Sequence, residues 1–153
     1  MTSLTIVDAE ATARNWVRNV AAIEALVSTR VFFSVDVPYS KAAKAEWIVM
    51  TLTSHTFQPG DLGLQLALIQ FDCWSPPPVS GGTKLKAATV ALALVTAARQ
   101  LSFGNPITIT NPGGPTAVIA WADAQQMRWF PDPQVWAPRY VVDVLFAIHG
   151  AEA

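Results

Sequence analysis

The sequence predicts an α+β fold, in which an antiparallel sheet of four or five strands carries two helices packed on one face. Two observations lead to this prediction. Residues 8–27 and 83–101 have helical character, whereas most other apolar segments are rich in β-branched and aromatic residues. The elements follow in the order α-β-β-β-α-β-β, which is typical of an antiparallel sheet with segregated helices. The length of 153 residues fits one domain, residues 1–153.

The first helix is predicted over residues 8–27. Asp8 is placed to cap its first turn, and Glu10 lies within that turn, where a carboxylate is favourable. Arg14 follows Glu10 by four residues, a spacing that allows an ion pair. Apolar residues recur at spacings of three and four and form one helix face: Ala13, Trp16, Val20, Ile23 and Val27.

Three strands are predicted next, over residues 30–37, 46–53 and 64–74. A polar loop separates the first two, and a turn over residues 54–63 that contains Pro59-Gly60-Asp61 separates the second from the third. The second and third strands are therefore predicted to form an antiparallel hairpin.

The third strand has apolar residues on both of its faces. Leu64, Leu66 and Leu68 share one parity, whereas apolar residues after position 68 occupy the other. A β-bulge near residue 68 explains the change of parity, and so does a strand that is covered on both faces. The second strand is also apolar on both faces. Because two helices on one face leave the other face open, we expect a neighbouring subunit to provide the second cover.

The second helix, residues 83–101, is Ala-rich and nearly apolar all round, which predicts burial on most sides. A loop over residues 104–115 contains a short extended piece, residues 107–110. Strands are predicted over residues 117–129 and 139–149. The last strand alternates, with one continuous apolar face: Tyr140, Val142, Val144, Phe146 and Ile148.

Charge is scarce in this chain. Charged residues make up 14% of the sequence and hydrophobic residues 52%, against about 25% charged residues in typical domains. Such a composition excludes a disordered chain, and a net charge of −1 argues against a dedicated nucleic-acid binder. The most apolar segment, residues 87–98, is shorter than the roughly 20 residues that a membrane span needs. We expect part of the surface to be covered in an assembly, and no membrane partner.

The sequence lacks a recognisable catalytic or metal-binding set. Cys73 is the single cysteine, and His55, His149 and Asp72 do not have ligand spacing on one element. The segment SGGTK at residues 80–84 lacks the leading glycine of a phosphate loop. Most aspartates outside helices lie beside turns, where their side chains stabilise the backbone. We therefore predict a non-enzymatic protein without catalytic, metal or cofactor residues.

The six tryptophans offer two interpretations. Trp16 and Trp47 fit core positions, but the others lie at strand ends and beside Pro-rich loops: Trp74, Trp121, Trp129 and Trp136. Aromatic residues at such positions are frequent anchors of subunit interfaces. The alternative is a small α+β ligand-binding or enzyme domain with a Trp-lined pocket, which would need convergent polar groups in that pocket.

The order and spacing of short segments along the whole chain resemble the tail terminator (tail completion) proteins of long-tailed bacteriophages of the siphophage type. An N-terminal helix in which Trp16 precedes Ala25-Leu26-Val27 is followed by Arg30-Val31-Phe32 and by a strand that ends Gln70-Phe71-Asp72-Cys73-Trp74. After the Ala-rich helix come Trp129-Phe130-Pro131-Asp132 and a strand that opens Pro138-Arg139-Tyr140-Val141-Val142-Asp143.

This resemblance implies a structural role at the head-proximal end of a virion tail, after assembly in the host cytoplasm. Terminators of this kind form a ring, usually a hexamer, that caps the tail tube and ends its polymerisation. The other face of the ring binds the head–tail connector protein, and DNA passes through the lumen without sequence-specific contacts. The implied partners are other copies of the chain, the tail tube protein and the connector protein.

The site residues are predicted from the chain itself. The loops over residues 36–44 and 54–61 are candidates for the surface that faces the tube or the lumen, because they are polar and contain a pair of lysines. The residues concerned are Lys41, Lys44, His55, Gln58 and Asp61. Trp129, Phe130 and Trp136 are candidates for the subunit interface.

Overall fold

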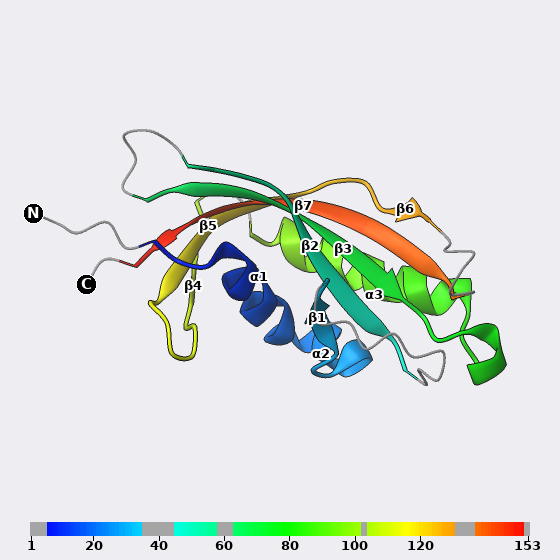
Figure 1. Ribbon diagram of the computed structural model, residues 1–153. Coiled ribbons are helices and arrows are strands. Elements are labelled where there is room, and N and C mark those ends of the chain that lie inside the picture. Colours follow the sequence, from blue (N-terminus) through cyan, green and yellow to red (C-terminus); the bar gives the residue numbers. More distant parts are fainter. Residues whose placement is uncertain (1–5, 35–44, 58–62, 102–103, 131–136, 152–153) are drawn as a thin grey trace, which may run out of the picture.

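A computed structural model describes residues 6–34, 45–57, 63–101, 104–130 and 137–151. The fold is α+β, with the helices against one face of a long, curled sheet (Figure 1). In chain order the elements are α1 (Ala9–Arg18), α2 (Ala21–Val27), β1 (Val31–Phe33), β2 (Trp47–Phe57), β3 (Gln65–Trp74), the 3₁₀ turn η1 (Pro78–Ser80), α3 (Lys84–Arg99), β4 (Ile107–Ile109), β5 (Ala117–Ala124), β6 (Arg128–Trp129) and β7 (Arg139–Gly150).

The sheet has seven strands, more than the four or five predicted. Its order is β1-β2-β3-β7-β5-β4, and β6 pairs with the beginning of β7. The added strands are short. The predicted strand over residues 117–129 is divided into β5 and β6 after Ala124, where the Gln125 N–H donates to the Asp143 carbonyl at 2.7 Å. The extended piece predicted near residue 107 is confirmed as the edge strand β4.

The sheet is antiparallel except at one edge, where β1 runs parallel to β2. The prediction of a wholly antiparallel sheet is therefore wrong at β1. This strand pairs over only three residues, from Val31 opposite Ile48 to Phe33 opposite Met50. Part of the predicted strand over residues 30–37 lies outside the described residues.

The predicted first helix is two helices. α1 ends where the Asn19 N–H donates to the Trp16 carbonyl at 3.0 Å, and Val20 is extended, with φ −81° and ψ 112°. The Asn19 side chain also donates to the Asn15 carbonyl at 2.7 Å. An Asn side chain that competes for backbone groups favours a helix end. The Asp8 cap is confirmed, because its carboxylate accepts the Ala11 N–H at 3.0 Å.

The β-bulge lies on β2 and not near residue 68 of β3. The register passes from Leu52 opposite Ile69 to Ser54 opposite Leu68, so Thr53 is the extra residue. β3 keeps its alternation, with its odd-numbered side chains buried beneath the helices. Leu66 and Leu68 therefore lie on the opposite face of the sheet and are half-buried.

The core lies between the helices and the central strands β3 and β7. Trp16 of α1 meets Phe146 of β7 edge-to-face, with ring centres 5.5 Å apart, and Phe71 of β3 lies 6.1 Å from the same ring. The predicted apolar face of β7 is confirmed, and its residues from Val142 to Ile148 are fully buried at every second position. One core thus joins α1, α2 and α3 to the sheet.

α3 confirms the predicted second helix, and Thr83 caps it by accepting the Lys86 N–H at 3.2 Å. The prediction that this helix is buried on most sides is only partly correct. One side of α3 packs on the sheet, but its outer side remains exposed and is uncharged between residues 87 and 98: Thr89, Leu92 and Thr96. Leu92 is 57% exposed, and Leu85 at the first turn is 75% exposed.

Candidate assembly surfaces

Within the described ranges, one face of the sheet carries no helix, and we call it the helix-free face. Figure 1 shows that α1, α2 and α3 all lie on the other side of the sheet. Half-buried apolar side chains of the central strands point to the helix-free face: Leu66 and Leu68 of β3, Leu145 of β7, and Val118 and Trp121 of β5. Because apolar surface is stabilised by removal from water, this face is suited to contact with another protein surface.

In the sequence, this face was indicated by apolar residues at both odd and even positions of the second and third predicted strands. That pattern had two interpretations, a β-bulge or a sheet whose second face is also covered. Only the register of β3 against β2 and β7 shows that Leu66 and Leu68 share a face with Leu145. The sequence did not indicate that the outer side of α3 is exposed. A helix that is apolar on all sides is the pattern expected for full burial.

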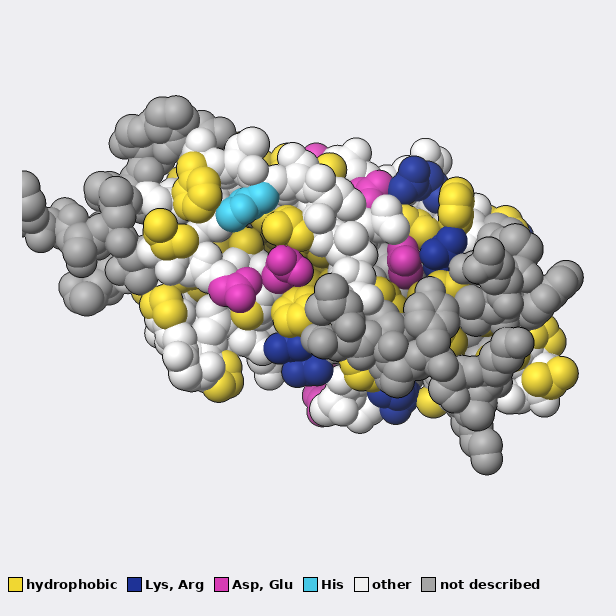
Figure 2. Space-filling view, in the orientation of Figure 1, with side chains coloured by type: hydrophobic (Ala, Val, Ile, Leu, Met, Phe, Trp, Pro, Cys, Tyr) yellow, Lys and Arg dark blue, Asp and Glu magenta, His cyan; other side chains and the backbone are white. Residues whose placement is uncertain are grey.

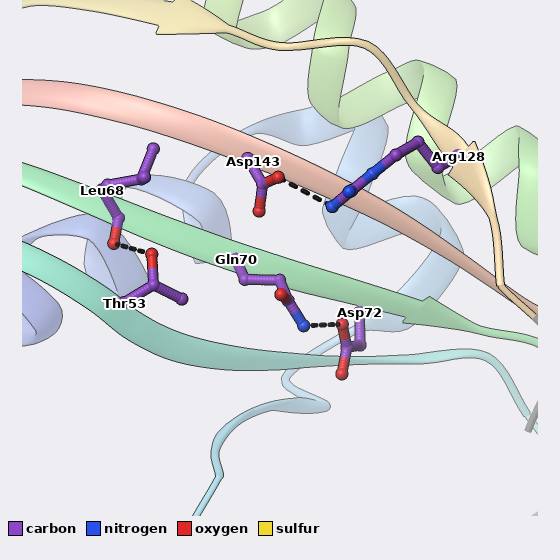
Figure 3. Close-up of polar contacts among 6 residues, drawn as sticks. All are labelled: Thr53, Leu68, Gln70, Asp72, Arg128 and Asp143. Carbon is purple, nitrogen blue, oxygen red and sulfur yellow. Dashed lines mark hydrogen bonds and ion pairs between the residues drawn. The ribbon is translucent and has the colours of Figure 1, made fainter.

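A row of polar side chains crosses the helix-free face (Figure 3). Gln70 of β3 donates from Nε2 to Oδ1 of Asp72 at 2.9 Å, and Nη2 of Arg128 lies 2.8 Å from Oδ2 of Asp143 on β7. Thr53, the bulged residue of β2, donates its hydroxyl to the Leu68 carbonyl at 3.0 Å. The row therefore consists of three separate contacts, each of which gives a polar side chain of this face a partner.

Asp72 is the most buried charged residue of this row. Burial raises the pKa of its carboxyl, although hydrogen bonds from Gln70 and the positive charge of Arg139 oppose the shift. Nη1 of Arg139 lies 3.5 Å from Oδ2 of Asp72. The ion pair therefore compensates only part of the cost of removing the carboxylate from water.

An aromatic cluster closes the helix-free face at the Asp72 end. Trp47 of β2 and Trp74 of β3 stack with ring centres 5.5 Å apart and an interplanar angle of 7°. The Arg139 guanidinium lies over the Trp74 ring at 4.8 Å, and Val49 and Ala137 complete a small buried cluster. Trp47 was predicted in the main core, but it packs on the other side of the sheet.

Trp129 and Phe130, two of the three predicted interface residues, are exposed at this same end. The Trp129 ring lies 5.2 Å from the Tyr140 ring, and Nζ of Lys84 lies 4.6 Å above it. The Phe130 ring is 4.9 Å from the Arg139 guanidinium, and its carbonyl accepts from Arg139 Nε at 2.8 Å. Phe130 is 57% exposed. Trp136, the third, lies outside the described residues.

Of the five predicted tube-facing or lumen residues, the structure describes only His55. It lies on β2 and not in a loop, because β2 continues to Phe57 beyond its predicted end. Nε2 of His55 donates to Oε1 of Gln65 at 2.6 Å, and Gln65 donates to the Val7 carbonyl at 2.9 Å. His55 thus helps to hold the segment before α1. The others lie outside the described residues: Lys41, Lys44, Gln58 and Asp61.

Arg14 does not form the ion pair that its spacing from Glu10 allows. Among the described residues the ion pairs are those of Arg128 and Arg139. The Arg14 guanidinium instead lies 4.0 Å over the Phe33 ring. Burial and the neighbouring charge of Arg14 lower the pKa of Arg18, which donates to the Val31 carbonyl at 3.0 Å. These arginines therefore tie α1 to the β1 edge.

The titratable groups that the sequence singled out lie apart from one another. His149 bonds the Gly150 carbonyl at 2.7 Å near the end of β7, whereas His55 is on β2. Cys73 is fully buried, and burial, aided by the negative charge of Asp72, raises the pKa of its thiol. Within the described part of the chain, no three His, Cys, Asp or Glu side chains are grouped to hold a metal ion.

The tryptophans are divided between the two faces of the sheet. Trp16 packs beneath the helices, whereas Trp47, Trp74 and Trp121 lie on the helix-free face. Trp121 pairs opposite Ala147 and Trp74 opposite Arg139, eight residues apart along β7. The described tryptophans therefore do not converge on one cavity.

Comparison of the chain with protein-family models and with curated proteins finds no match. No helix within the described ranges has the length and apolar character that crossing a membrane requires.

Proposed function

We propose that this protein is a structural subunit of a ring that caps the tail tube of a long-tailed bacteriophage. The observation that carries the proposal is a pair of partly apolar surfaces on opposite sides of one fold that no described helix or strand covers. These are the helix-free face and the outer side of α3. A chain with 14% charged residues that leaves such surfaces open is suited to burying them against copies of itself.

The arrangement of elements also supports the proposal. The resemblance to tail terminators implies a sheet flanked by helices, and the chain has an α+β fold with its helices on one face. Figure 2 shows broad neutral and apolar areas between a few charged side chains on one side of the molecule. A surface of this kind favours contacts between proteins over electrostatic binding to nucleic acid.

In the proposed assembly, Trp129, Phe130 and Trp136 contribute to the contact between neighbouring subunits. The segment over residues 36–44 and the segment that follows β2, with Gln58 and Asp61, face the last ring of the tube or the lumen. The closed ring, for which we expect six copies, ends tube polymerisation and presents its other face to the connector protein. DNA passes through the lumen without sequence-specific contacts, and the mechanism is binding without a chemical step.

A phage that lacks this protein tests the proposal directly. We expect electron micrographs of its lysates to show overlong tails without heads, because tube growth is not ended and the connector has no binding surface. Supply of the intact protein in trans should restore tails of uniform length. Tails of normal length joined to heads in the absence of the protein would refute the proposal.

A mass measurement by light scattering provides the second test. We expect the purified protein, alone or mixed with its tail tube protein, to form a closed species of fixed mass. Electron microscopy of that species should show rings. A protein that stays monomeric both alone and with the tube protein would contradict ring formation.

A further inference from the structure

No described strand pairs with the outer edge of β2 over most of its length. β1 pairs only with Ile48, Val49 and Met50, and the Ser34 N–H donates to the Met50 carbonyl at 3.0 Å as the last of these bonds. Beyond that point no described strand lies against the outer edge, although β2 runs on to Phe57. Alternate residues from Thr51 to Phe57 therefore direct backbone N–H and C=O groups away from β3.

The side chains of this segment do not protect the edge. Its sequence, TLTSHTF, has no lysine, arginine, aspartate, glutamate or proline, which are the residues that usually prevent one sheet edge from pairing with another. Residues from Thr53 onward are exposed, and Phe57 is 51% exposed. Pairing with β3 holds this segment in an extended conformation. Another strand can therefore add to its edge without first ordering it.

A second unpaired edge lies on the opposite side of the same end of the sheet. β4 pairs with β5 through residues Ile107 to Ile109 and ends the strand order, so its other edge is free among the described strands. Its side chains, Ile-Thr-Ile, are also uncharged. Figure 1 shows that β4 and the far half of β2 flank the end of β7, with β3 and β5 between them.

We propose that the free edge of β2 in one copy pairs with the β4 edge of the next copy, so that the sheet continues from subunit to subunit. This inference rests on the ring proposed above and names the contact that closes it. Two different edges of one chain make a head-to-tail contact, which repeats and closes into a ring when the rotation allows. Pairing of β2 with a second β2 would instead end at a dimer.

The registers show which side chains meet across such a contact. Thr56 lies opposite Leu66, which lies opposite Ala147, and Thr108 lies opposite Val118, which lies opposite His149. These residues therefore share the helix-free face, as does Ser54 opposite Leu68. In a continuous antiparallel sheet, directly opposite residues of a non-hydrogen-bonded pair have Cβ atoms roughly 4.5 Å apart, which a disulfide can bridge.

Cysteine cross-linking of the full-length protein tests the pairing. One variant contains Thr56→Cys with Thr108→Cys, and a second contains Ser54→Cys with Thr108→Cys to sample the neighbouring register. Each single variant is the control, and the native Cys73 is buried and does not compete. Under mild oxidation we expect at least one double variant to give a ladder of covalent multimers on a non-reducing gel, and the single variants to stay unlinked.

A charge test uses the same positions without oxidation. Thr56→Lys should lower the fraction of assembled protein in light scattering at least tenfold, because a lysine on a strand edge opposes pairing. Adding Thr108→Glu to that variant should restore assembly, since the opposite charges then face each other across the contact. Gln126→Lys, at an exposed position between β5 and β6 and outside both edges, should assemble like the unchanged protein.

The outcomes separate this contact from the ring itself. Covalent dimers from Thr56→Cys alone would overturn the inference, because they would show β2 pairing with β2. Assembly that persists in Thr56→Lys, with no ladder from either double variant, would overturn the edge contact while the ring stands. A protein that is monomeric and gives no ladder would overturn the inference, and the phage that lacks the protein would then decide the proposed function separately.

Discussion

Arg139 and Asp72 form an ion pair on the helix-free face, with 3.5 Å between Nη1 and Oδ2. Both side chains are largely buried. The guanidinium also lies over the Trp74 and Phe130 rings and donates to the Phe130 carbonyl. Arg139 therefore joins β3, β7 and the segment after β6 at one end of the sheet.

The first prediction concerns Asp72 and pH. Its pKa is raised in the folded state, so the folded protein binds this proton more tightly than the unfolded chain does. The group therefore stabilises the fold below its ordinary pKa of about 4. That contribution is lost as pH rises through the raised pKa. The Asp72→Asn variant lacks this contribution. As pH rises from about 4 through the raised pKa of Asp72, the unfolding free energy of the unchanged protein should therefore fall relative to that of the variant.

Urea denaturation of both proteins at a series of pH values measures the effect. Asp123→Asn is the matched control, because Asp123 is exposed and should give a curve parallel to that of the unchanged protein. If the unfolding free energy of Asp72→Asn also changed with pH in parallel with that of the unchanged protein, burial would not raise the pKa of Asp72.

The second prediction compares two adjacent glycines before α3. Gly81 has a φ of +84° with open space at the Cβ position, so Gly81→Ala should cost about 1 kcal/mol from backbone strain alone. At Gly82 a Cβ atom would overlap the carbonyl oxygen of Pro76 and crowd the Ser75 hydroxyl. Gly82→Ala should therefore be clearly more destabilising than Gly81→Ala in thermal unfolding. An equal or smaller effect would show that the turn shifts freely.

The third prediction concerns Trp16, which fills the core against Phe146. Trp16→Ala should lower the free energy of unfolding by roughly 3–5 kcal/mol, because it leaves a cavity beneath the helices. Trp16→Phe keeps an aromatic ring there and should cost less. Chemical denaturation followed by circular dichroism measures both changes. A loss of less than 1 kcal/mol in Trp16→Ala would contradict the central position of this side chain.

The fourth prediction separates folding from assembly at Phe130. Phe130→Ala removes an exposed ring but keeps the carbonyl that Arg139 bonds, so the stability of the protomer should change by less than about 1 kcal/mol. Association should weaken by about tenfold or more if the ring anchors the subunit contact. Ile6→Ala, at another exposed apolar residue, is the control. Unchanged association of Phe130→Ala in light scattering would remove Phe130 from the interface.

The fifth prediction concerns the thiol of Cys73. The side chain is fully buried and its pKa is raised, so the thiolate that reacts with alkylating reagents is scarce in the folded protein. Iodoacetamide should leave the native protein unmodified at neutral pH and modify it in denaturant. Mass spectrometry counts the adducts. Rapid modification of the native protein would show that β3 opens readily.

The sequence alone predicted the strongly periodic elements. β7 and the extent of α3 agree with it, because alternation in β7 and the Thr83 cap are local signals. The hairpin of β2 and β3 also agrees. The division of the first helix at Asn19 was missed, since its apolar period continues from Trp16 to Ile23 across the break. β4 was predicted as a short extended piece, whereas β6, with two residues, is too short to establish a period and was merged with β5.

Tertiary structure alone decided the placement of these elements. Whether Leu66 and Leu68 reflect a bulge or a second surface depends on pairing with β2, and the bulge at Thr53 shows in the register alone. The meeting of Asp72 with Arg139 depends on contacts between residues distant in the chain. The charge deficit was visible in the composition. Only the fold showed that apolar side chains remain half-buried or exposed on the helix-free face, the outer side of α3 and the edge of β2 that no described strand pairs with, because burial depends on which strands and helices become neighbours.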